Sequence, residues 1–160
     1  MDTVATVPFS STRAYLLEAR YEFLRLLRTP SFSLPCLLFP PVFYLLFGVL
    51  LGGKGGPVAA QYLLAGYGVF GVIGVALFGF GVTVALDREQ GLLTLKRAQP
   101  MPPGAYLVAK MAMALLFAAI ILLLLAALAA GVAHVRLSAA QWGAWAATCL
   151  IGVLPFSALG

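Results

Sequence analysis

The chain has 160 residues, of which 62% are hydrophobic and 9% are charged, with ten Lys or Arg against five Asp or Glu. A soluble domain averages about 45–50% apolar and about 25% charged residues, so this composition excludes a water-soluble globule and a disordered chain. Four long runs contain no Asp, Glu, Lys or Arg: residues 29–53, 55–86, 111–135 and 137–160. Each exceeds the roughly 20 residues that a helix needs to cross a bilayer. The composition predicts an integral membrane protein with four spans.

The residue pattern within these runs predicts helices, and it shows no arrangement of residues typical of a catalytic site. Residues 120–130 are apolar at every position, whereas a membrane β-barrel alternates apolar with polar residues. Cys36 and Cys149 lie far apart inside apolar runs, and His134 is the single histidine. There is no phosphate-binding glycine loop followed by Lys and Ser or Thr. We therefore expect an all-α transmembrane bundle with no catalytic, cofactor-binding or metal site in this chain.

The N-terminal part is predicted to be a tail, residues 1–9, followed by an amphipathic helix, residues 10–28. Ser10, Ser11 and Thr12 offer N-cap oxygens, and Thr29-Pro30 interrupts the helix. A helical projection separates an apolar face from a polar face. The apolar face holds Tyr15, Leu16, Ala19, Phe23, Leu26 and Leu27, and the polar face holds Glu18, Glu22, Arg25 and Arg28. With Arg20 at the boundary, the pattern favours a helix in the headgroup plane, although a partner groove or plain solvation would also fit.

The transmembrane domain, residues 29–160, is expected to hold spans at about 33–51, 61–86, 111–132 and 142–160. Pro40 and Pro41 should kink or break the first span, and the many glycines of the second favour close helix packing. Trp142 and Trp145 suit an interfacial aromatic belt. None of the four predicted spans contains an ionisable group, which argues against proton-coupled transport through them.

The basic residues predict the orientation. Eight of the ten lie in the N-terminal segment and in the loop 87–110. The turns at the opposite ends of the spans hold one each, Lys54 and Arg136. The positive-inside rule then places the N-terminus and this loop in the cytoplasm, in a plasma (inner) membrane. Anionic lipid headgroups account for the net charge of +5, so we expect membrane lipids as partners and no nucleic acid.

The loop 87–110 carries the most informative pattern: acid, base, acid, any residue, glycine, then spaced leucines, a proline, and a lysine at the next span. These positions are Asp87, Arg88, Glu89, Gly91, Leu93, Leu95, Pro100 and Lys110. The arrangement resembles the cytoplasmic loop of ABC exporter permeases of the type 2 family. The amphipathic helix, the prolines of the first span and the sequence Pro155-Phe156-Ser157-Ala158-Leu159-Gly160 support this resemblance from Ser10 onward.

The resemblance implies a six-span permease of which four spans are present here, working with a cytoplasmic ABC ATPase and a second permease chain in a homodimer or heterodimer. ATP and magnesium would bind to the ATPase. By the same resemblance, the ATPase-coupling interface comprises Asp87, Arg88, Glu89, Gly91, Leu95 and Pro100, and the interfacial helix contributes Arg20, Arg25 and Arg28. The residues alone are also compatible with two other classes of protein: a membrane scaffold or assembly protein, and an intramembrane enzyme with polar residues in further spans.

Overall fold

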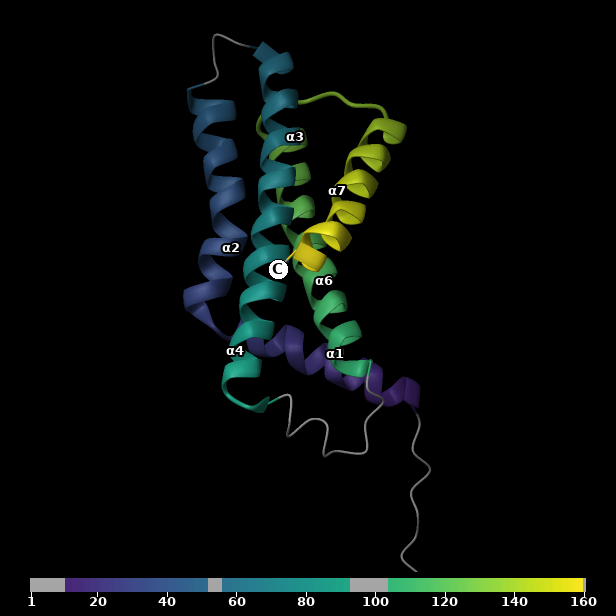
Figure 1. Ribbon diagram of the computed structural model, residues 1–160. Coiled ribbons are helices and arrows are strands. Elements are labelled where there is room, and N and C mark those ends of the chain that lie inside the picture. Colours follow the sequence, from purple (N-terminus) through teal and green to yellow (C-terminus); the bar gives the residue numbers. More distant parts are fainter. Residues whose placement is uncertain (1–10, 52–55, 93–103, 160) are drawn as a thin grey trace, which may run out of the picture.

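A computed structural model describes residues 11–51, 56–92 and 104–159 of the protein (Figure 1). The described residues form helices joined by short turns, without any strand. The elements in chain order are α1 (Ser11–Leu27), α2 (Pro30–Phe43), the π-helix η1 (Tyr44–Leu50), α3 (Gly56–Gly74), the π-helix η3 (Val75–Val82), α4 (Thr83–Glu89), α6 (Ala105–Gly131) and α7 (Ala139–Leu159). The predicted all-α helical bundle is confirmed.

The helices are arranged as a bundle with one crosswise helix beneath it. The segments α2–η1, α3–η3–α4 and α6 run lengthwise, α7 slants against them, and α1 lies across one end (Figure 1). The end of α4 and the start of α6 lie at this α1 end, whereas α3 begins at the opposite end. α1 packs mainly against α6 and also contacts α2. The two most basic segments of the sequence therefore border the same end of the bundle.

Four helices are long and apolar enough to cross a membrane by length and composition: Pro30–Leu50, Val58–Glu89, Ala105–Gly131 and Ala139–Leu159. Each overlaps one predicted span. The second and third extend further toward the α1 end than the hydropathy pattern indicated, so that Asp87 and Lys110, the two ends of the predicted loop 87–110, lie inside helices.

The prolines of the first span change the type of helix instead of breaking it. Pro35, Pro40 and Pro41 lie inside α2, and the chain continues directly into η1. A proline removes a backbone donor and crowds the preceding turn, and a π-helix widens the turn by bonding residue i to residue i+5. The backbone N–H of Tyr44 donates to the carbonyls of Pro40 and Pro41 at this junction. Of the predicted kink or break, the break does not occur, and a wider turn follows the prolines.

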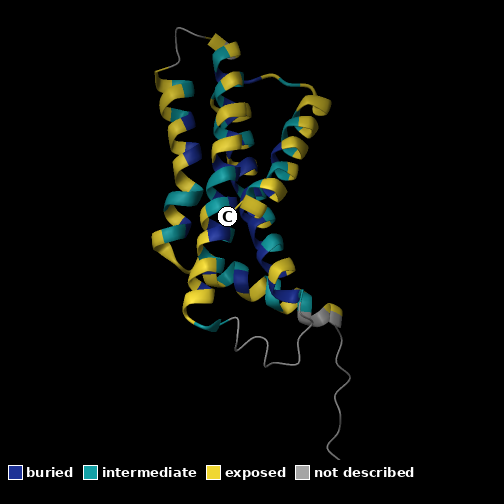
Figure 2. Ribbon diagram, in the orientation of Figure 1, coloured by how far each residue is buried: buried dark blue, intermediate teal, exposed yellow. Residues whose placement is uncertain are grey.

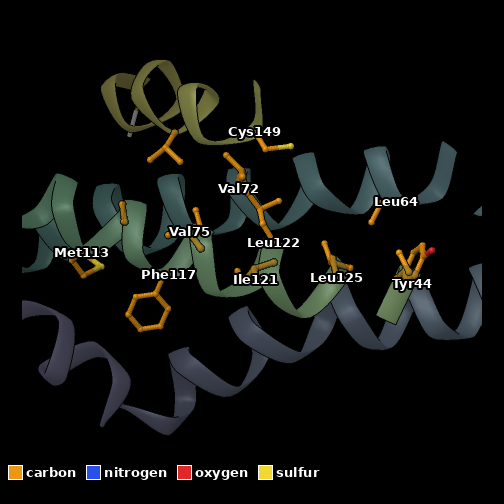
Figure 3. Packing of buried hydrophobic residues seen from close by; sticks show 14 of the residues in the cluster. Tyr44, Leu64, Val72, Val75, Met113, Phe117, Ile121, Leu122, Leu125 and Cys149 are labelled. Carbon is orange, nitrogen blue, oxygen red and sulfur yellow. The ribbon is translucent and has the colours of Figure 1, made fainter. Parts of the chain in front are cut away.

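α6 is the central helix of the hydrophobic core. Met113, Phe117, Ile121 and Leu125 recur every four residues along one face and are completely buried (Figure 3). The ring of Phe117 packs against Phe23 of α1 and Phe32 of α2, with ring centroids 5.2 and 6.1 Å apart. This aromatic contact joins the crosswise helix to the bundle.

Apolar side chains also cover the outside of the bundle, where Figure 2 shows exposed residues along every lengthwise helix. Leu50, Leu123 and Ile151, on three different helical segments, are 76%, 70% and 66% exposed. A soluble monomer rarely exposes apolar area on this scale. The outer surface is instead suited to the hydrocarbon core of a bilayer.

The glycines of the second span permit close helix packing, as expected from the sequence. A Cβ atom on Gly71 would lie 2.7 Å from Cγ2 of Ile121 and 3.2 Å from Cγ of Pro40. Such a contact is far inside normal van der Waals separation, so α3 approaches α6 and α2 this closely only because Gly71 has no side chain.

Replacing Gly71 with alanine should therefore lower the stability of the bundle by about 1–3 kcal/mol, the usual cost of overpacking. Thermal unfolding of the purified protein in detergent measures this effect. Gly66→Ala is the matched control on the same helix, because a Cβ atom at Gly66 would meet nothing within 4 Å. Equal melting temperatures for the two variants would contradict the close-packing assignment.

Candidate functional site

Polar side chains from three helices meet at the α1 end of the bundle, around a buried lysine. Each helix contributes two residues spaced three or four positions apart, so that both lie on one face. We call the six residues the charge cluster: Glu22 and Arg25 of α1, Thr83 and Asp87 of α4, and Tyr106 and Lys110 of α6. All but Arg25 are buried or half-buried.

Lys110 is the centre of the cluster. Its side chain is 0% exposed, and its Nζ lies 2.8 Å from Oδ2 of Asp87 and 3.2 Å from Oε2 of Glu22. The same Nζ donates a hydrogen bond of 3.1 Å to the hydroxyl of Thr83. Lys110 therefore makes ion pairs with two carboxylates and a hydrogen bond with a hydroxyl, and these partners come from both of the helices that flank α6 at this end.

Asp87 is the second buried charge, with a side chain that is 1% exposed. Besides Lys110, it accepts a hydrogen bond of 2.7 Å from the Tyr106 hydroxyl and one of 3.0 Å from Nη2 of Arg25. Thr83 lies one turn before Asp87 and accepts a hydrogen bond from Lys110. One face of α4 therefore contributes both of its polar residues to the cluster.

Arg25 connects the cluster to its surroundings. Its side chain is 51% exposed, and its Nη1 lies 3.8 Å from Oε1 of Glu22, which is itself 4% exposed. Partial burial opposes the charged form of Arg25, but the hydrogen bond and the charge of Asp87 outweigh this effect and raise the pKa of the guanidinium. Arg25 is therefore firmly cationic and is the one member of the cluster that reaches the surface.

The cluster balances two carboxylates against two cations. A buried charge is tolerated only when it is paired and hydrogen-bonded, and removing one partner of a buried pair costs about 3–5 kcal/mol because the other charge is left uncompensated. The arrangement therefore fixes the position of α1 relative to α4 and α6 more strictly than apolar packing alone would. The described residues contain no group of three or more His, Cys, Asp or Glu that could hold a metal ion.

The structure places the predicted site residues in different surroundings. Arg88 and Glu89 are exposed at the end of α4, and Gly91 ends this helix with a φ of 71°, a left-handed conformation that favours glycine. Leu95 and Pro100 lie outside the described residues. Asp87, by contrast, faces the interior and gives its carboxylate to the cluster. On α1, Arg20 is exposed and Arg25 is half-exposed, and Arg28, directly after the helix, is exposed.

Two findings go beyond the expectations from the sequence. The predicted spans 61–86 and 111–132 contain no Asp, Glu, Lys or Arg, but their helices continue past these bounds, so that Asp87 and Lys110 lie near the helix ends at α1 and form an ion pair there. The placement of Glu22 on the polar face of α1 is wrong, because its side chain is 4% exposed and lies against Lys110. The rest of the projection agrees better, since Phe23 and Leu26 of the expected apolar face pack into the core and Arg28 of the expected polar face is exposed.

Glu22, Thr83 and Tyr106 were not identified as site residues from the sequence. A signal for Tyr106 existed, since it precedes Lys110 by four residues at the boundary of a long apolar run. A lysine at that boundary needs a counter-charge or a route to water. The sequence spacing alone does not indicate which carboxylate supplies the counter-charge.

Comparison with known proteins gives the class and then the family. The helices define a multi-pass membrane protein. Residues 13–160 match the family described as "ABC-2 type transporter", and the chain belongs to this family of transport permeases. It is 29% identical over 144 residues to the "Putative transport permease YvfS" of Bacillus subtilis (strain 168), an alignment covering 87% of this chain and 58% of that protein. The chain thus spans less than two thirds of the length of this relative. No solved structure gives a significant match.

Removing the central charge tests the cluster. Lys110→Met should destabilise the protein by about 3–5 kcal/mol, because Glu22 and Asp87 would then be buried without their shared cation. The double variant Lys110→Met with Asp87→Asn should lose less than the sum of the two single variants, since it removes opposite charges together. Denaturant or thermal unfolding in detergent measures the three values.

The matched control is Arg136→Met, which removes a basic residue from the exposed turn between α6 and α7. This variant should change stability by less than about 0.5 kcal/mol. Strict additivity of Lys110→Met and Asp87→Asn would show that the two side chains do not interact.

Proposed function

We propose that this chain is the membrane-spanning permease part of an ATP-driven exporter, in which a separate cytoplasmic ABC ATPase hydrolyses ATP with magnesium. A second permease chain, identical or different, completes the assembly. The orientation that goes with this proposal puts the N-terminus and the α1 end on the cytoplasmic side of the plasma membrane. The positive-inside distribution of basic residues supports this orientation.

The observation that carries the proposal is the junction of α1, α4 and α6. Through the charge cluster, α1 is bonded to the end of one span and the start of the next. The exposed Arg88 and Glu89 and the helix-ending Gly91 follow Asp87 directly. A partner that pushed on this segment would therefore act on α1 and on two spans at once.

The mechanism that follows is a population shift. Binding of ATP draws the two ATPase subunits together, and their contact with residues Arg88 to Gly91 favours one of two packings of the spans. The permease supplies no chemistry to ATP hydrolysis in this scheme. Its contribution is a rigid junction, because a flexible one would absorb the movement of the ATPase without transmitting it.

Altering the exposed segment should uncouple hydrolysis from movement. In the complex with its ATPase, Glu89→Ala with Gly91→Pro should leave membrane insertion and ATP hydrolysis in place but abolish the ATP-dependent conformational change of the spans. The thiol of Cys36, which lies in α2 and lines a cavity, is a native reporter, once Cys149 has been replaced by alanine. Its maleimide labelling rate is compared with and without ATP and vanadate.

The control is Arg136→Ala, in the turn at the opposite end of the bundle, which should retain an ATP-dependent labelling rate. If the Glu89→Ala, Gly91→Pro variant retains the same ATP-dependent change as the unaltered protein, the assignment of the coupling segment is wrong. If the unaltered chain never co-purifies with an ABC ATPase, the exporter proposal itself fails.

A further inference from the structure

A cavity of about 540 Å³ opens beside the charge cluster, between α1, α2 and the continuous helix α3–η3–α4. Its volume falls within the range of about 300–1,000 Å³ typical of small-molecule sites. Along α2 the lining extends from Ser31 to Pro40, which corresponds to roughly 14 Å at 1.5 Å per residue. The cavity is therefore an elongated one, with one end at the charge cluster and the other toward the middle of the bundle.

The two ends of the cavity differ in chemistry. Toward the middle of the bundle its wall is aromatic and apolar, from Phe39, Pro40 and Phe70, and Phe78 continues this apolar wall toward the α1 end, next to Gly79, which lies close to Phe32. Of these, Phe39, Phe70 and Phe78 are 50–59% exposed, so their rings are open to an occupant. At the α1 end the lining contains Arg25, Thr29, Ser31 and Gln90 together with the cluster. One ligand that satisfies both ends must itself be amphipathic.

The accessible charged group at the polar end is a cation. The carboxylates of Glu22 and Asp87 are almost completely buried and are balanced by Lys110 and Arg25 together, so neither carboxylate presents a negative charge to the cavity. The guanidinium of Arg25 is half-exposed, and with five donors it has capacity beyond its contacts with Asp87 and Glu22. The other exposed charged residues nearby in sequence, Arg28 after α1 and Arg88 and Glu89 of α4, do not line the cavity.

We infer that this cavity is a binding site for an anionic amphiphile, with one apolar chain along the aromatic wall and a phosphate-type headgroup at Arg25. A guanidinium binds phosphate oxygens through paired N–H donors, and such charge-assisted bonds are strong in a site of low polarity. A water-soluble anion would leave the aromatic wall without a partner, and a purely apolar molecule would make no use of the Arg25 donors that Asp87 and Glu22 do not occupy. The inference goes beyond the proposed function, since binding of this kind requires no ATPase.

Photochemical labelling tests this site directly. The probes are two lipids with the same diazirine-bearing acyl chain, a phosphatidylglycerol and a phosphatidylcholine, each added sparingly to the purified protein in phosphatidylcholine nanodiscs. The anionic probe should label peptides that contain Phe39 and Phe78, and mass spectrometry locates the adducts. The zwitterionic probe should label the same peptides roughly tenfold less, which corresponds to about 1.4 kcal/mol of binding.

A pair of glycine variants separates the cavity from the general lipid surface. Gly74 lines the cavity, and a Cβ atom there would meet nothing within 4 Å, so Gly74→Leu should fill the cavity without a backbone clash. Gly66 is equally open but lies outside the cavity, so Gly66→Leu is the matched control. Labelling by the anionic probe should fall roughly tenfold in Gly74→Leu and stay unchanged in Gly66→Leu. Should Gly74→Leu not fold, Val82→Phe fills the same cavity from an exposed position and should show the same loss.

Three results would overturn the inference. One is undiminished labelling in the folded cavity-filling variant, and another is equal labelling by the two headgroups. The third is that a second copy of the chain, or another segment of the same protein, covers the cavity. Protein cross-links to α2 and η3 in place of lipid adducts would reveal this. None of these results depends on ATP, so the coupling experiment with Glu89 and Gly91 can succeed or fail independently.

Discussion

A buried lysine needs a counter-charge, and the α1 end of this protein is organised by that requirement. Lys110 lies in α6, a helix of 27 residues without another charged side chain. An uncompensated ammonium at this depth would cost several kcal/mol. Glu22 and Asp87 compensate it from two other helices, and Thr83 accepts a hydrogen bond from it. The positions of α1 and α4 relative to α6 follow from these contacts.

The other features of this end depend on the same placement. With Glu22 turned inward, Phe23 comes to lie on Phe117 of the core, and the outer side of α1 presents Leu16 and Leu27 beside the exposed Arg20. With Asp87 turned inward, Arg88 and Glu89 are left at the surface. The amphipathic cavity also takes its polar end from Arg25, the one half-exposed member of the cluster. One set of ion pairs thus relates the proposed coupling segment, the crosswise helix and the proposed amphiphile site.

The sequence predicted the elements well and their faces less well. Long apolar runs determine spans because lipid offers no partner to backbone groups, so all four membrane-length helices and α1 could be expected from hydropathy and capping residues. The inward orientation of Glu22 could not, since an amphipathic projection treats every carboxylate as solvated, and Glu22 forms an ion pair with a lysine 88 positions later in the chain. The wider turns of η1 and η3 also escaped prediction. They depend on how prolines and glycines pack against neighbouring helices, which periodicity does not encode.

The most direct test of this account is the distance between α1 and α6 in the assembled protein. Spin labels at two exposed positions, Arg20 on α1 and Leu116 on α6, would be measured by pulsed electron paramagnetic resonance in nanodiscs after replacement of Cys36 and Cys149. We predict a single narrow distance distribution that becomes broad and shifts to longer distances in Lys110→Met, while Arg136→Met leaves it unchanged. An identical narrow distribution in Lys110→Met would contradict the claim that the buried charges hold α1 in place.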